Sequence, residues 1–189
     1  MKITNKENKA FSFYEVTIPV YIRCLENLLK IMGKAELFAK KKRISMKKLL
    51  TARLISDMFT FTQQVQYSYF MALDGASHLS DKKSPTFSYD EKTMSELKAS
   101  VRKTISYLKT IKPIDFQGVE NKKVPVFYSP KKSLPADKYI TTLGLPNFFF
   151  HYTTAYDILR HLGVPIGKDD YLGDYKTAIS HTFQKLPSN

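Results

Sequence analysis

The chain has 189 residues, of which 43% are hydrophobic and 25% are charged, and its formal net charge is +13. This length fits a single domain, 1–189, with enough residues to bury a core. Cys24 is the only cysteine, which excludes an internal disulfide and a metal site built on cysteine pairs. No apolar run approaches the roughly 18 residues that a membrane-spanning helix requires, and the polar N-terminus lacks the apolar core of a signal peptide. We therefore expect a cytoplasmic protein without a membrane partner.

The positive charge suggests a polyanionic partner, either a nucleic acid or an anionic membrane surface. A solvated lysine-rich surface is the alternative. The basic residues are mostly lysines, and they are spread over several turns: Lys40–Arg43, Lys82–Lys83, Lys122–Lys123 and Lys131–Lys132. Specific DNA readers use arginine for bidentate contacts to bases, and arginine is scarce here. The pattern therefore favours the solvated surface, and a nucleic-acid partner is not expected.

Residues 1–12 are expected to form a loose arm before the first helix. That helix is predicted from near Thr17 to about Ala39, because Thr17 can cap it and Pro19 suits its first turn. Cys24 is interpreted as a small core or boundary residue beside the buried face. Apolar residues at three- and four-residue steps predict that face: Ile18, Ile22, Leu25, Leu29 and Met32.

The second helix is predicted from after Ser45 to about Leu73. Asp57 and Gln64 share its core side, so they are expected to point inward or to the boundary. A buried carboxylate needs a partner, because an unpaired buried charge is unfavourable. Asp57 is therefore either a structural residue, paired with Arg53 or the backbone, or a metal ligand or site base. The apolar residues that mark this core side are Leu50, Leu54, Phe61, Val65 and Ala72.

A connector is predicted over 74–88, and it is long for a helix hairpin, so it can cross the bundle. His78 in this connector is interpreted as solvated. The third helix is predicted to open with Ser88 and Glu91 as a capping box. Its buried face is predicted to hold Met94, Leu97, Val101, Ile105 and Leu108.

The remainder of the chain predicts a short extended segment and a fourth helix. Residues 112–135 are expected to form an extended segment with a turn, such as a short hairpin. The prolines argue against a central strand. The fourth helix is predicted over about Ala136–Leu162, with a break or kink near Gly144–Pro146. A tail over 164–189 is expected to fold back on the helices. The fold class is therefore an all-α bundle of four helices.

A histidine lies in the middle of the apolar face of the fourth helix, which is formed by Phe148, His151, Ala155, Ile158 and Leu162. One interpretation is a core histidine hydrogen-bonded to Asp57. The other is a metal ligand or general base, with Asp57 as its orienter or co-ligand. The other histidines, which are interpreted as solvated or as favourable at a helix end, are His78, His161 and His181.

Two segments carry a family resemblance. They are 53–66, with the sequence RLISDMFTFTQQVQ, and 147–163, with the sequence NFFFHYTTAYDILRHLG, followed by IGKDDYLG at 166–173. They resemble the family named domain of unknown function nineteen-ninety-three, which is grouped with the DinB/YfiT-like four-helix bundles. The resemblance implies an up-down-down-up bundle with a long crossover between helices two and three. It also implies frequent dimerisation, so a homodimer is expected.

Relatives in that superfamily often bind a divalent metal through three histidines, one from helix two and a His-x-x-x-His pair from helix four. His151 matches the first histidine of the pair, but Ala155 stands at the second position and helix two has no histidine. His161 lies about 15 Å from His151 along a helix axis, which is too far for one ion. The three-histidine site is therefore predicted to be lost. A mixed site of His151, Asp57 and a third group is the alternative.

Two functions are compatible with these features. The first is a divergent metal-assisted enzyme acting on a small molecule, with His151 and Asp57 as catalytic and metal-binding residues and a divalent metal as cofactor. The second is a small-ligand-binding or stress-related bundle that has lost the metal site. The residues expected to line the pocket are Phe61, Gln64, Phe148 and Tyr152.

Overall fold

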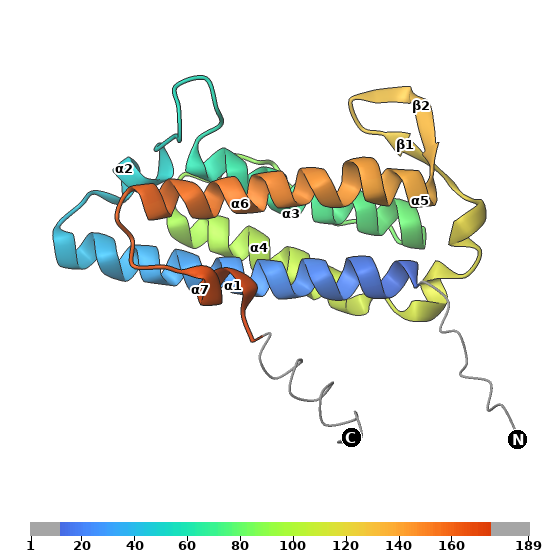
Figure 1. Cartoon of the computed structure of the whole chain (residues 1–189), viewed down its shortest axis with the longest axis horizontal. Coiled ribbons are helices and arrows are strands. Elements are labelled where there is room, and N and C mark those ends of the chain that lie inside the picture. The colour runs from blue at the N-terminus through green and yellow to red at the C-terminus, as the bar shows by residue number, and fades with distance from the viewer. Residues whose placement is uncertain (1–11, 175–189) are drawn as a thin grey trace, which may run out of the picture.

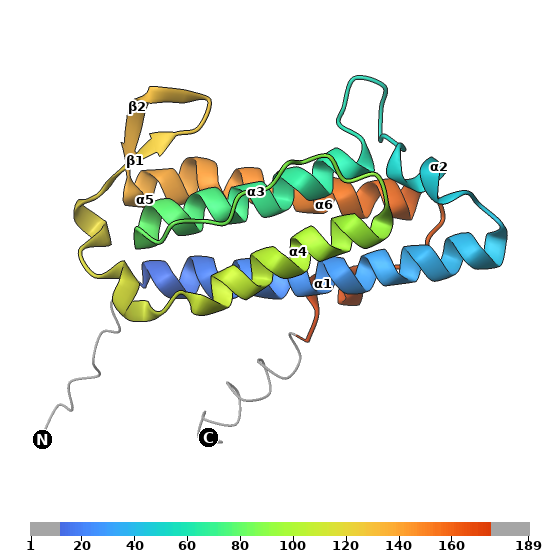
Figure 2. The same ribbon diagram turned by 180° about the vertical axis from the view of Figure 1, so that it is seen from behind.

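Four long helices form the body of the molecule in the computed structural model, which describes residues 12–174 (Figure 1). α1 and α6 run in one direction and α3 and α4 in the other, so the bundle is up-down-down-up (Figures 1 and 2). This confirms the all-α fold class. The expected N-terminal arm before Ser12, and His181, lie outside the described residues. The four helices are α1 (Phe13–Lys42), α3 (Phe61–Ser80), α4 (Met94–Thr110) and α6 (Leu145–His161).

Short elements connect and flank the bundle. They are α2 (Met46–Leu50), the 3₁₀ turns Pro113–Phe116 and Val119–Asn121, β1 (Lys123–Val126), β2 (Ser129–Pro135), α5 (Ala136–Lys138), a π-helical turn (Tyr139–Gly144) and α7 (Lys168–Leu172). β1 and β2 pair antiparallel, which confirms the hairpin expected within 112–135. The hairpin and the loop between α2 and α3 project from the same side of the bundle, towards opposite ends (Figure 1). α7 packs against α1, so the described part of the tail folds back on the bundle.

α1 begins at Phe13, one turn before the expected start at Thr17. Ser12 caps it, because Ser12 Oγ accepts a hydrogen bond from the Glu15 N–H at 3.2 Å. The Thr17 hydroxyl instead donates to the Phe13 carbonyl oxygen at 2.6 Å. Pro19 therefore lies inside the helix and not in its first turn.

The prediction of one continuous second helix is wrong, because residues 51–60 form a loop between α2 and α3. Thr60 and Gln63 form a capping box at the start of α3. The Gln63 N–H donates to Thr60 Oγ1 at 3.2 Å, and the Thr60 N–H donates to Gln63 Oε1 at 2.9 Å. Since α3 starts there, the preceding residues leave the helical register. Leu54 and Asp57, both expected on the core side, are exposed in the loop.

The crossover between α3 and α4 spans 81–93 and returns along the bundle (Figure 2). It comes later than the expected 74–88, because α3 continues beyond its predicted end. Ser88 is not the cap of α4. Thr93 and Glu96 form the capping box instead, with the Thr93 N–H donating to Glu96 Oε2 at 3.0 Å. The predicted face of α4 is confirmed, since all its residues are buried: Met94, Leu97, Val101, Ile105 and Leu108.

The chain does not break near Gly144–Pro146, because it stays helical through α5, the π-helical turn and α6, and the irregularity expected there is the π-helical turn. Proline has no N–H to donate, and its ring crowds the carbonyl four residues back. The π-helical turn accommodates this, with the Leu145 N–H donating to the Ile140 carbonyl oxygen five residues back. Tyr139, at the start of the turn, is fully buried.

The core is built from the apolar faces of the four long helices. Cys24 is buried, and burial raises the pKa of its thiol to about 11, as expected for a core residue. No helix within residues 12–174 is long and apolar enough to cross a membrane. The predicted face of α1 is buried or half-buried throughout: Ile18, Ile22, Leu25, Leu29 and Met32. The largest fully buried side chains are aromatic, and they include Tyr21, Tyr69, Tyr139, Tyr152, Phe61 and Phe148.

Candidate functional site

His151 on α6 is buried, with 6% of its surface exposed. Its Nδ1 lies 2.7 Å from Oε1 of Gln64 on α3, and the two atoms are hydrogen-bonded when Nδ1 carries the ring proton. Burial lowers the pKa of His151 to about 4, because an apolar setting disfavours the charged ring. His151 is therefore neutral near pH 7, with the lone pair on Nε2.

Three aromatic rings pack around the His151 imidazole. The ring centroids of Tyr67, Phe150 and Phe59 lie 4.9, 5.2 and 6.1 Å from it. Phe59 and Tyr67 also stack on each other, with their centroids 4.8 Å apart. Phe59 and Phe150 remain 38% and 54% exposed. This aromatic cluster therefore extends from the buried polar pair to the surface.

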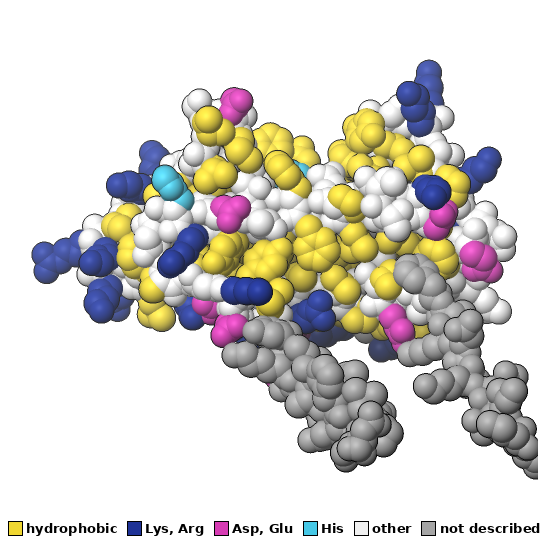
Figure 3. Space-filling view, in the orientation of Figure 1, with side chains coloured by type: hydrophobic (Ala, Val, Ile, Leu, Met, Phe, Trp, Pro, Cys, Tyr) yellow, Lys and Arg dark blue, Asp and Glu magenta, His cyan; other side chains and the backbone are white. Residues whose placement is uncertain are grey.

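A groove of about 260 Å³ adjoins the cluster at Tyr67. Its lining comes from α3, from the crossover and from the turn of the hairpin: Gln66, Tyr67, Phe70, Tyr89 and Phe127. The aromatic rings contact each other across it, with the Phe70 centroid 5.6 Å from that of Phe127 and 6.1 Å from that of Tyr89. Figure 3 shows hydrophobic side chains in the area between the projecting loop and the hairpin. We refer to this site as the aromatic groove.

Glu91 ties the crossover to α3 at the edge of the aromatic groove. Its carboxylate accepts hydrogen bonds from Tyr69 Oη at 2.8 Å and from Gln66 Nε2 at 2.7 Å. Gln66 Nε2 also donates to the Tyr89 carbonyl oxygen at 3.0 Å, and Tyr89 has a left-handed backbone (φ 56°), which is uncommon for a non-glycine residue. Burial alone would raise the pKa of Glu91, but hydrogen bonds from Ser100, Gln66 and Tyr69 lower it overall. The crossover is thus held by an ionised carboxylate.

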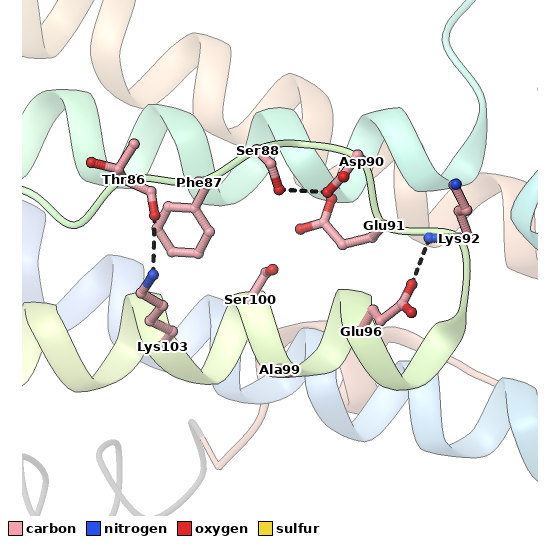
Figure 4. A pocket seen from close by; sticks show the side chains of 10 residues that line it. All are labelled: Thr86, Phe87, Ser88, Asp90, Glu91, Lys92, Glu96, Ala99, Ser100 and Lys103. Carbon is pink, nitrogen blue, oxygen red and sulfur yellow. Dashed lines mark hydrogen bonds between the residues drawn. The ribbon is translucent and has the colours of Figure 1, made fainter.

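A second, more polar pocket of about 470 Å³ lies between the crossover and α4 (Figure 4). Several of its polar groups are already bound within the chain. Lys103 Nζ lies 4.5 Å from the Phe87 ring centroid and donates to the Thr86 carbonyl oxygen at 3.0 Å. Glu96 accepts from the Lys92 N–H at 2.8 Å. The charged side chains around the pocket are Asp90, Glu91, Lys92, Glu96 and Lys103.

Polar side chains join α3 to the π-helical turn, beside a buried tyrosine of α1. Tyr139 Oη donates to Asp74 Oδ2 at 2.5 Å, and His78 Nε2 lies 3.5 Å from Asp74 Oδ1. Tyr21 Oη is the only fully buried side-chain polar atom without a hydrogen-bond partner among the described residues. A Cβ on Gly75 would lie 3.0 Å from that oxygen. Local patterns do not indicate these contacts, because the spacing predicts that the second helix ends near Leu73 and that a connector follows over 74–88.

Of the predicted site residues, the structure brings together His151 and Gln64. Asp57 is not the hydrogen-bond partner of His151, because it lies exposed in the 51–60 loop and Gln64 occupies that role. The other three predicted lining residues are fully buried in the core, outside the lining of the aromatic groove: Phe61, Phe148 and Tyr152. Phe148 packs on Tyr21 with ring centroids 4.8 Å apart.

The groove residues were missed, because they come from three segments that only the tertiary structure brings together. The spacing of Tyr67 and Phe70 on one helix face was the available signal. Tyr89 and Phe127 lie in irregular segments, where no periodicity shows which way a side chain points. The wall that they form could not be deduced from local patterns.

The residues around His151 do not fit the divalent metal that the superfamily resemblance implies. The facing helix supplies the amide of Gln64, and the position one turn along α6 is Ala155. One imidazole and one amide do not make the ligand set of a divalent ion. Among residues 12–174, no group of three His, Cys, Asp or Glu side chains is placed to share a metal.

The comparisons with known proteins agree with this architecture. The family model described as Domain of unknown function (DUF1993) matches residues 13–172. The chain belongs to this family. The DUF1993 chain is also similar to a solved structure, a DinB family member protein from Shewanella denitrificans, with 34% identity and a TM-score of 0.80; the match covers 85% of this chain and 91% of that one. No curated protein matches the chain.

Proposed function

We propose that this DUF1993 protein binds a small, flat, uncharged molecule in the aromatic groove. The observation that carries the proposal is the position of Tyr67, which lines the groove and packs 4.9 Å from the His151 imidazole. Aromatic walls favour a flat apolar body, because rings stack in offset or edge arrangements. A charged ligand is disfavoured, because it would lose hydration while Glu91 is already bound to Tyr69 and Gln66.

His151 places a neutral polar group beside the aromatic walls. The hydrogen bond to Gln64 fixes the ring, and Nε2 keeps a lone pair that accepts a hydrogen bond from an N–H or O–H group. A histidine with a pKa of about 4 is a weak base near pH 7. The site is therefore better suited to binding than to proton abstraction.

The alternative, a metal-assisted enzyme, has less support. It requires His151, Asp57 and a third ligand around one ion. His151 is instead bound to Gln64, and Asp57 lies in the exposed loop. The same geometry supports the reading in which the bundle binds a ligand without the metal of its relatives.

A ligand-observed NMR screen of the full-length, tag-free protein against one- and two-ring heteroaromatic compounds, such as indole and naphthol, tests the proposal. Phe127→Ala removes a wall of the groove and is expected to weaken binding about tenfold, since an aromatic contact contributes up to about 1.5 kcal/mol. Tyr128→Ala is the matched control, because Tyr128 is 70% exposed and is not part of the groove lining; its ring touches only the edge of the Phe127 wall, with the centroids 5.1 Å apart. Binding should change less than about twofold in this control.

Two results would overturn the proposal. The first is a screen in which no compound of this class binds to the wild-type protein. The second is an equal loss of affinity in Phe127→Ala and Tyr128→Ala, which would place binding on the outer surface of the hairpin and not in the aromatic groove.

A further inference from the structure

The turn between α1 and α2 gathers basic side chains at one end of the molecule. Between Glu36 and Asp57 the chain contains no acidic residue. The structure brings the basic residues of this stretch to the end of the bundle where α1 meets α2, and Figure 3 shows Lys and Arg side chains gathered there. We call the following six exposed residues the basic end: Lys40, Lys41, Lys42, Arg43, Lys47 and Lys48.

None of the six has an ion pair within residues 12–174. The lysines with ion pairs in this part of the chain lie elsewhere: Lys34, Lys82, Lys98, Lys109, Lys122 and Lys138. Positive charge in the last turn of α1 stabilises the helix through its dipole, which accounts for Lys40–Lys42. Lys47 and Lys48 lie in the last turn of α2, a helix of only 5 residues. The run Lys40–Arg43 and the pair Lys47–Lys48 thus lie at the same end of the bundle.

Aliphatic side chains are exposed close to the basic end in the chain. Leu37 is 71% exposed, Leu54 is 42% exposed and Ile55 is 60% exposed. The loop that carries Leu54 and Ile55 is closed by backbone hydrogen bonds, from the Phe61 N–H to the Ala52 carbonyl oxygen at 2.8 Å and from the Met58 N–H to the Ile55 carbonyl oxygen at 3.0 Å. These bonds hold the loop in a conformation that leaves both side chains in water.

We infer that the basic end, together with Leu54 and Ile55, is a surface that docks on an anionic lipid bilayer. Clustered lysines attract acidic headgroups, and exposed aliphatic side chains gain by entering the interface. Sequence-specific contacts to nucleic-acid bases rely on bidentate arginines, whereas five of the six residues of the basic end are lysines. The protein docks on the bilayer and does not cross it, since no helix within residues 12–174 can span a membrane.

Co-sedimentation of the full-length protein with phosphatidylcholine vesicles, with and without phosphatidylserine, tests the inference. The wild-type protein should bind only the vesicles that contain phosphatidylserine. Lys47→Gln/Lys48→Gln should weaken this binding about 25-fold, because each basic residue near the surface contributes about fivefold. Lys131→Gln/Lys132→Gln is the matched control, since it removes the same charge from exposed positions of the hairpin. Its effect should stay below about twofold, because the hairpin projects towards the other end of the bundle and salt screens charges beyond about 8 Å (Figure 1).

Leu54→Ser/Ile55→Ser separates lipid binding from simple attraction between charges. It should weaken binding to the phosphatidylserine vesicles about tenfold and leave retention on heparin unchanged, since heparin offers charge but no apolar interior. Far-UV circular dichroism checks that each variant is folded. The inference is overturned if the wild-type protein shows no phosphatidylserine-dependent binding. It is also overturned if the Leu54→Ser/Ile55→Ser variant binds the vesicles as tightly as the wild type, or if the lysines of the basic end are required for binding an oligonucleotide while vesicles are not bound.

Discussion

Acidification is expected to destabilise the fold through His151. The pKa of His151 in the folded protein is about 4, whereas a histidine in an unfolded chain titrates at about 6.5. Between these values the unfolded chain binds a proton that the folded protein does not bind. The free energy of unfolding therefore falls as the pH falls. The contribution is fully present above about pH 6.5 and is lost progressively down to about pH 4, and at about pH 5 the loss is roughly 2 kcal/mol.

The measurement is urea unfolding followed by far-UV circular dichroism at about pH 7.5 and about pH 5, at equal ionic strength. The comparison protein is His151→Leu/Gln64→Leu, which replaces both partners of the hydrogen bond and leaves no buried polar group of the pair behind. The remaining titratable groups are present in both proteins, so their contributions cancel in the difference. The wild-type protein should lose roughly 2 kcal/mol more than the variant between the two pH values.

Equal losses in the two proteins would refute the argument, because they would show that His151 titrates alike in the folded and unfolded states. An NMR titration of the imidazole Hε1 proton checks the same point directly, with a midpoint near about 4 expected and one near about 6.5 contradicting the burial argument. His78 acts in the opposite direction. Its hydrogen bond to Asp74 raises its pKa, so its stabilising contribution is present below the unfolded pKa and is lost as the pH rises through the folded one.

Gly33→Ala should stabilise the protein by about 0.5–1 kcal/mol, because Gly33 lies inside α1 with open space around it. Gly75→Ala should instead destabilise the protein by about 1 kcal/mol, because the added methyl group lies 3.0 Å from the buried Tyr21 hydroxyl. Urea unfolding measures the free energy of unfolding of both variants. An equal increase in both would contradict the crowding proposed at Gly75. Thr93→Ala should lower the free energy of unfolding by about 1 kcal/mol through loss of the α4 cap, while Ser88→Ala should change it by less than about 0.5 kcal/mol. A larger loss of stability in Ser88→Ala than in Thr93→Ala would contradict this cap and favour Ser88 as the start of α4. Elemental analysis of the tag-free protein after incubation with zinc, nickel or manganese should find no stoichiometric metal, and one tightly bound ion per chain would contradict the assessment of the ligand set. The homodimer implied by the family resemblance stays a prediction, and sedimentation equilibrium tests it.

Local sequence patterns determined the elements whose boundaries depend on their own residues. The apolar spacing of α4 predicted its buried face correctly, since a side chain's direction on a helix depends only on its position in the repeat. The breaks at 51–60 and before Met94 also had local signals, because Thr60 with Gln63 and Thr93 with Glu96 both match a capping box. The capping box at Thr93 lies close to the competing pattern at Ser88. The capping box at Thr60 lies within an uninterrupted helical spacing of apolar residues.

Only the tertiary structure decided which side chains meet. His151 was recognised from its place on an apolar face, but its partner is Gln64 and not Asp57, because the loop at 51–60 removes Asp57 from the helix. The aromatic groove joins Tyr67 to Phe127 across sixty positions of the chain. The sequence thus determined the bundle and its central histidine, because helical periodicity and capping act within one or two turns. The groove depends on where loops bring distant segments, which no local pattern records.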